Sequence, residues 1–182
     1  MPCGIPSAYT VNRMLPKRKP ISVQFRPALR AWRGKLRTGQ GPGTPVHAGS
    51  FLRKRQIVVD SELLTSPKEA GRILIHELYH FVWLGLGNNA RKSYEALVAA
   101  EIRAGAKGEL GWSSEWRKDA LAARDLRARS RRWRDYSCES FCDTAAWMCL
   151  GGRHEEFTLP EAQRKRRRTW FLRAVALKAI SL

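Results

Sequence analysis

The chain has 182 residues, enough for one domain with a sizeable hydrophobic core and too few for two comfortable domains. Its 34 Lys and Arg against 16 Asp and Glu give a formal charge of +18, which favours acidic partners, nucleic acid first and an anionic membrane surface second. An Arg-rich solvated surface would give the same charge. No segment has the roughly 20 apolar residues of a membrane-spanning helix, and the N-terminus has no apolar secretory core. We therefore expect a cytoplasmic protein with no transmembrane segment.

Residues 1–43 have the composition of a tail. No acidic residue precedes Asp60, and six prolines interrupt any long element. These are Pro2, Pro6, Pro16, Pro20, Pro27 and Pro42. Residues 26–37 are compatible with one short basic helix, and the Gly-rich residues 39–43 are typical of a hinge. We therefore predict a disordered basic tail over residues 1–43 and a folded domain over residues 44–182.

The folded part begins with the pattern of a β-hairpin. Two short segments that contain apolar residues, 46–52 and 56–60, read as strands, and the basic residues 53–55 between them form the turn. Strand 46–52 is a candidate edge strand with which an extended peptide could pair by β-augmentation. An ordinary hairpin that covers the next helix fits the pattern equally well.

The following segment contains the motif His-Glu-x-x-His, formed by His76, Glu77 and His80. On an α-helix, residues four apart share a face, so the two imidazoles converge on one point that suits Zn²⁺. Glu77, next along the helix, is placed to act on a water at the same metal. Ser66 with Pro67 after it is typical of a helix start, so we predict a core helix that presents a metal site.

Four later helices are expected from the apolar periodicity. They cover residues 93–104, residues from 113 through 134, residues 136–150 and residues 161–180. The stretch 127–134 is the densest basic segment of the folded part, and Trp133 within it could stack on a base while its arginines neutralise phosphates. It could equally be an exposed helix end. The basic run 164–168 lies next to an apolar stretch and could dock on nucleic acid or a membrane surface. We instead expect the apolar part to pack on the core and the basic run to be solvated.

Helix 136–150 carries the second informative pattern. Glu139 and Asp143 lie four apart and are therefore adjacent on one face. Two carboxylates on an otherwise small and apolar helix are costly to bury unless a cation holds them. Cys138, Cys142 and Cys149 share a stripe of the same helix, where we expect small buried hydrophobes rather than disulfides. A zinc site made only of cysteines would also need distant Cys3.

Together, His-Glu-x-x-His and a later Glu-x-x-x-Asp resemble the gluzincin branch of the zincin metallopeptidases. The resemblance covers residues 46–150 at most and implies an α+β, mostly helical, zincin-like fold with a small antiparallel sheet. It implies that His76, His80 and Glu139 bind zinc, that Glu77 is the general base, and that Asp143 supports a zinc-bound histidine. The 59 positions between His80 and Glu139 are about three times the usual gap.

Other third ligands stay open at this point. Glu101 lies nearer the usual distance but has Gly105 where the Asp should follow, and His47 and His154 are further candidates. The metzincin pattern is disfavoured because it requires Gly and His where this chain has Trp83 and Leu86.

The sequence thus predicts a zinc-dependent metallopeptidase that acts on a peptide or protein substrate, with Tyr136 and His154 as candidate oxyanion donors. Two alternatives rest on the basic charge. One is a DNA-associated protease similar in logic to the SprT-like peptidases, although these use a third histidine. The other is a nucleic-acid-binding module whose zinc is structural and closed by a fourth protein ligand such as His47.

Overall fold

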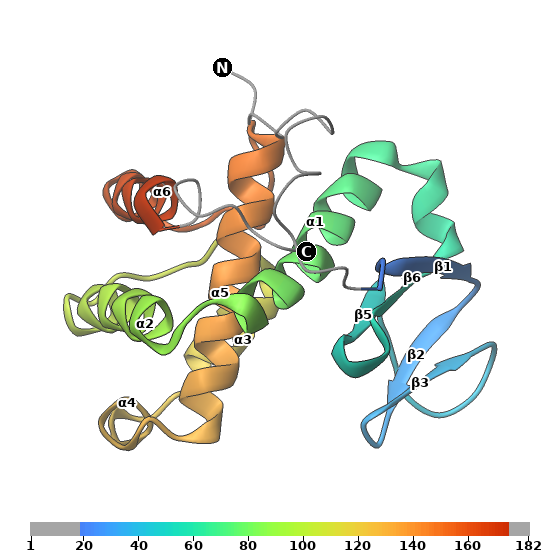
Figure 1. Ribbon diagram of the computed structural model, residues 1–182, viewed down its shortest axis with the longest axis horizontal. Coiled ribbons are helices and arrows are strands. Elements are labelled where there is room, and N and C mark those ends of the chain that lie inside the picture. Colours follow the sequence, from blue (N-terminus) through green and yellow to red (C-terminus); the bar gives the residue numbers. More distant parts are fainter. Residues whose placement is uncertain (1–18, 175–182) are drawn as a thin grey trace.

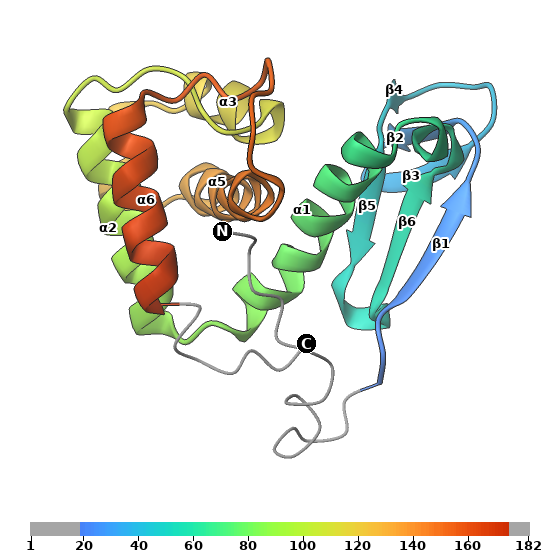
Figure 2. The ribbon, with the colours of Figure 1, turned by 90° about the horizontal axis from the view of Figure 1, so that it is seen from above.

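Helix α1 (Pro67–Gly85) joins the two halves of the molecule in the computed structural model, which describes residues 19–174. Two small β-sheets lie on one side of α1, and helices α2 to α6 lie on the other (Figures 1 and 2). The predicted α+β, mostly helical class is confirmed. Among the described residues, no helix is long and apolar enough to cross a membrane.

Each of the two sheets has three strands. The first has the order β1 (Ser22–Arg26), β6 (Gln56–Asp60), β5 (Ala48–Phe51), with β1 parallel and β5 antiparallel to β6. The second is antiparallel, in the order β3 (Lys35–Thr38), β2 (Leu29–Trp32), β4 (Thr44–Pro45). The prediction of one small antiparallel sheet is therefore wrong in number, and it holds for strand direction in every described pair except β1 with β6.

The predicted tail over residues 1–43 is also wrong in its second half, because strands β1 to β3 lie there. Arg33 (φ 48°) and Gly34 (φ 72°) both adopt positive φ, the conformation of a two-residue hairpin turn, so residues 26–37 form strands rather than a basic helix. Leu29 is buried and anchors this hairpin. Residues 1–18 of the predicted tail lie outside the described residues.

The predicted hairpin over residues 46–60 is confirmed. Strands β5 and β6 pair in antiparallel register, and a 3₁₀ turn, Leu52–Lys54, connects them. Strand β5 is the outer strand of its sheet and packs against α1. Between this sheet and α1 lies a small apolar core that includes Ile57, Val59 and Phe81. Strand β5 is therefore held beside the helix that carries the histidines.

The helical half is built on α5, which crosses α1 (Figure 1). Its elements are α2 (Asn88–Arg103), α3 (Trp112–Asp119), α4 (Ala123–Ala128), α5 (Arg131–Leu150) and α6 (Glu161–Ala174). The predicted helix from residue 113 through 134 is instead divided among α3, α4 and the start of α5. The second break lies at Arg129, which adopts a left-handed conformation (φ 44°) that ends α4. Ser130 then caps α5 by accepting a hydrogen bond from the backbone N–H of Trp133.

Trp133 is a core residue, and the prediction that it could stack on a base is wrong. Its side chain is 2% exposed and its ring packs on Tyr136. Its indole N–H donates to Glu95 (3.4 Å), which also receives Arg129 at 2.7 Å and 2.8 Å. The basic stretch is thus folded over an aromatic core, and one of its arginines is tied to a buried carboxylate.

A buried ion cluster fastens α6 to the rest of the helical half. Arg167 is fully buried and donates to Glu101 (2.9 Å and 2.7 Å) and Glu109 (2.6 Å and 3.0 Å). Burial alone would raise the pKa of Glu109, but Arg167, with Lys118 and Tyr136, holds it below its usual value. The prediction that the whole run 164–168 is solvated is therefore wrong at Arg167.

Replacing Arg167 with Met should destabilise the fold by about 3–5 kcal/mol, because it removes the cation that two buried carboxylates share and leaves only Lys118, near Glu109. Urea unfolding followed by circular dichroism measures the change. Arg168→Met, at the neighbouring exposed position, is the matched control and should alter stability by less than about 0.5 kcal/mol. Equal stability of the two variants would contradict the structural role of this cluster.

Candidate metal centre

His76 and His80 lie one turn apart on α1, with ring centroids 5.0 Å apart. The crossing of α5 over α1 brings Glu139 to the same point. Its Oε2 atom lies 3.2 Å from His76 Nε2 and 3.9 Å from His80 Nε2. The structure therefore brings together the three side chains that the sequence proposed as metal ligands, although 59 positions separate His80 from Glu139.

Asp143 supports the ring of His76 from behind. His76 Nδ1 donates to Asp143 Oδ1 at 2.7 Å, and the other carboxylate oxygen of Asp143 accepts from the backbone N–H of Ser114 at 3.0 Å. Gly111 makes this approach possible, since a Cβ at that position would lie 2.4–2.6 Å from the Asp143 carboxylate. Burial alone would lower the pKa of His76, but Asp143 and Glu139 raise it well above its usual value. The same negative field would attract a cation.

Glu139 is held as an ionised carboxylate. Burial alone would raise its pKa, but the hydrogen bond with His76, together with the charges of His80, His76 and Arg117, lowers it to about 2. Ser113 donates a hydrogen bond to its Oε2 atom, and Arg117 lies 3.4 Å from Oε1. An anionic oxygen facing two imidazole nitrogens matches the donor types that Zn²⁺ prefers.

Glu77 points to the β-sheet side of α1 rather than to α5. Its Oε2 atom accepts a hydrogen bond from the Ser50 hydroxyl at 2.5 Å, and the same hydroxyl lies 3.0 Å from the Glu77 backbone oxygen. Ser50 belongs to the outer strand β5. The candidate general base is therefore tethered to the strand that is the candidate docking edge for a peptide.

Two donor sets can be drawn around the histidines, and they differ in the third ligand. Ligand atoms of His76, His80 and Cys142 all lie within 4.8 Å of one another, so a site with Cys142 is one possibility. However, the Nδ1 atoms are already engaged, by Asp143 for His76 and by the Cys138 sulfur (3.4 Å) for His80. The free Nε2 atoms both face Glu139, so we take Glu139 as the third donor.

The other third-ligand candidates lie elsewhere. Glu101 is buried in the ion cluster of Arg167 and is not free to bind a metal. His154 contacts Glu69 (3.3 Å) and accepts from the backbone N–H of Glu156, and His47 is exposed.

Neither proposed oxyanion donor is at the centre. The hydroxyl of Tyr136 donates to Glu109 at 2.6 Å, so this residue serves the buried ion cluster. His154 is occupied as described above.

Several contacts of the centre were not predicted from the sequence. Ser50, Ser113 and Arg117 bind Glu77 or Glu139, and no local pattern marks them. Cys142 is buried, as predicted, but the same prediction for Cys138 is wrong because its sulfur contacts a histidine. A hydrogen bond with Cys142, and after it one with His80, lowers the pKa of Cys138 to about 6 against the effect of burial. The sequence did contain one signal for this contact, because Cys138 directly precedes Glu139, a predicted metal ligand.

No family model, curated protein or solved structure matches this chain. The chemistry of the site is therefore inferred from its own geometry.

Protein purified without added metal should contain about one zinc per chain, because two imidazoles and a carboxylate converge there. His80→Ala and Glu139→Ala should each lose most of that zinc, as measured by elemental analysis and competition with a chromogenic chelator. Glu155→Ala removes an exposed carboxylate and should retain it. If Glu139→Ala keeps zinc as tightly as the wild type, the third ligand is another residue, with Cys142 the next to test.

Proposed function

We propose that this protein is a zinc-dependent metallopeptidase with a zincin-like domain of the gluzincin type. One observation carries the proposal: Glu139 faces Nε2 of both motif histidines while Asp143 accepts from Nδ1 of His76. This arrangement supplies three donors and an outer acceptor that orients one of them, as catalytic zinc sites require. Helices α2, α3 and α4 fill the long gap between the two motifs.

Zn²⁺ held by His76, His80 and Glu139 would supply a Lewis acid that acidifies a water and polarises a peptide carbonyl. Glu77 then accepts the proton of the attacking water and passes it to the leaving amine. The hydrogen bond from Ser50 orients the Glu77 carboxylate for this transfer. Asp143 keeps the proton of His76 on Nδ1, which leaves Nε2 free as a ligand.

The substrate is an extended peptide segment that pairs with β5. This strand is the outer one of its sheet, so the backbone groups on its free side are open to a further strand. Ser50 connects the same strand to Glu77, so a peptide paired there would lie beside the general base.

Glu77→Gln should lower kcat for peptide cleavage by at least about 10²-fold, because the amide cannot accept the proton of the attacking water. Zinc content should be unchanged, since Glu77 is not a ligand. A peptide-library cleavage assay followed by mass spectrometry measures activity, and Glu155→Gln is the control carboxylate. Full activity in Glu77→Gln would exclude this mechanism.

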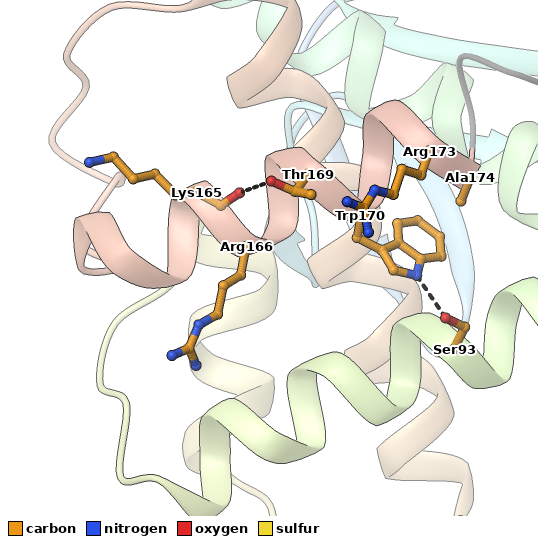
Figure 3. A pocket seen from close by; sticks show the side chains of 7 residues that line it. All are labelled: Ser93, Lys165, Arg166, Thr169, Trp170, Arg173 and Ala174. Atoms are coloured by element: carbon orange, nitrogen blue, oxygen red, sulfur yellow. Dashed lines mark hydrogen bonds between the residues drawn. The ribbon is translucent and has the colours of Figure 1, made fainter.

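A second candidate function, association with nucleic acid, is favoured by a groove of about 640 Å³ between α2 and α6 (Figure 3). Three cations line it, Lys165, Arg166 and Arg173, and no carboxylate does. Lys165 is paired with Glu161, whereas Arg166 and Arg173 have no ion pair among residues 19–174. Two guanidiniums on one wall are therefore available for phosphate groups.

Binding of a fluorescent oligonucleotide should weaken as salt rises. The double variant Arg166→Gln/Arg173→Gln should reduce the slope of log K against log salt by about 2, one for each lost phosphate contact. Fluorescence anisotropy at several salt concentrations measures both quantities. Arg124→Gln/Arg132→Gln removes the same charge from exposed positions of α4 and α5 and should leave most of the affinity.

Equal losses in the two double variants would mean that net charge, not the groove, attracts nucleic acid. Binding that is independent of salt, or binding only to anionic lipid vesicles, would exclude this candidate.

A further inference from the structure

The two histidines of the candidate metal centre have different partners behind their rings. His76 Nδ1 faces the carboxylate of Asp143 at 2.7 Å, whereas His80 Nδ1 faces the sulfur of Cys138 at 3.4 Å. Both partners belong to α5 and lie on either side of Glu139 in the chain. One helix therefore supplies the third donor and a partner for each histidine.

A histidine that binds a metal through Nε2 carries its remaining proton on Nδ1, and the acceptor of that proton fixes the tautomer and the ring orientation. For His76 this acceptor is a carboxylate. For His80 the only contact described at Nδ1 is the Cys138 sulfur, and His80 Nε2 faces Glu139. The sulfur thus occupies the position that an orienting acceptor requires.

Cys142 completes the arrangement one turn further along α5. Its side chain is fully buried and lies on the same face of α5 as Cys138. A thiol at that position can donate its S–H to the Cys138 sulfur, which would leave that sulfur as the acceptor toward His80.

We propose that Cys138 is a positioning residue for the metal centre, which accepts the Nδ1 hydrogen of His80 as Asp143 does for His76. The inference rests on the proposed metal site but does not require that the site cleave peptides. Without Cys138, the His80 ring would lose the contact that directs Nε2 toward Glu139. Cys138 itself does not contact the metal or the substrate in this role.

Substitutions at residue 138 test this role because they vary the strength of the hydrogen-bond acceptor that faces His80 Nδ1. Cys138→Ala removes it, and zinc affinity should fall by about 10–100-fold, as for other outer partners of metal-bound histidines. Cys138→Ser keeps an acceptor on a shorter side chain, so its affinity should be intermediate. Cys138→Asp places a carboxylate oxygen near His80 Nδ1 and should bring affinity back to within a few-fold of the wild type.

Zinc affinity is measured by competition with a chromogenic chelator, with circular dichroism as the test of folding. Nitrogen-15 NMR of the zinc-loaded histidines gives a second readout, in which Cys138→Ala should lose the hydrogen-bonded Nδ1–H signal of His80 and Cys138→Asp should keep it. Cys149→Ala, a thiol removed further along the same helix, is the matched control and should behave as the wild type.

Folded Cys138→Ala that binds zinc as tightly as the wild type would overturn the proposal. Weak binding in Cys138→Ala that Cys138→Asp does not restore would also overturn it, because the thiol would then act through packing. If the wild type binds zinc, the variants follow the graded order of affinity and no peptide is cleaved, the proposed peptidase activity would be refuted and the role of Cys138 would stand. A wild type that binds no zinc would refute both.

Discussion

The crossing of α1 and α5 is the contact on which the site depends. It places the carboxylates of Glu139 and Asp143 against the two histidines in a largely buried position, where an isolated charge would be costly. Each helix alone carries polar groups on a face that should be apolar. When the helices cross, the histidines of α1 and the carboxylates of α5 satisfy one another. The arrangement tolerates little displacement, as the close approach of Gly111 to Asp143 indicates.

Two pairs of carboxylates in the helical half, Glu101 with Glu109 and Glu139 with Asp143, are balanced by different partners. Glu101 and Glu109 meet Arg167, a permanent cation whose guanidinium donates to both, and Lys118 lies 3.4 Å from Glu109, so two cations balance the two carboxylates. Glu139 and Asp143 instead contact imidazoles, which can lose a proton and, as neutral groups, bind a metal. The identity of the basic partner therefore separates a structural cluster from a site able to bind a cation.

Local patterns predicted the parts of the site that share one helix. The spacing of His76 and His80, and that of Glu139 and Asp143, follows from helical geometry, and the preference of buried carboxylates for a cation then links the two helices. The contacts of Ser50, Arg167 and Cys138 were not predictable in this way, because each depends on which distant segments meet. The β2–β3 hairpin was not predicted because the surrounding prolines indicated a tail and its two-residue turn begins with Arg33, a residue type that rarely adopts positive φ.

The position of Glu77 explains why the β-sheets and the helices both matter to the proposed chemistry. Successive helical residues are rotated by about 100°, so Glu77 cannot share the face of His76 and turns toward the sheet. There Ser50 of the outer strand β5 donates a hydrogen bond to the Glu77 carboxylate, while the histidines face α5. A peptide paired with β5, as proposed, would then lie beside Glu77, while the candidate metal ligands lie on the α5 side of α1. Because α1 carries Glu77 and both histidines, this one helix fixes the spacing between the proposed base and the candidate ligands.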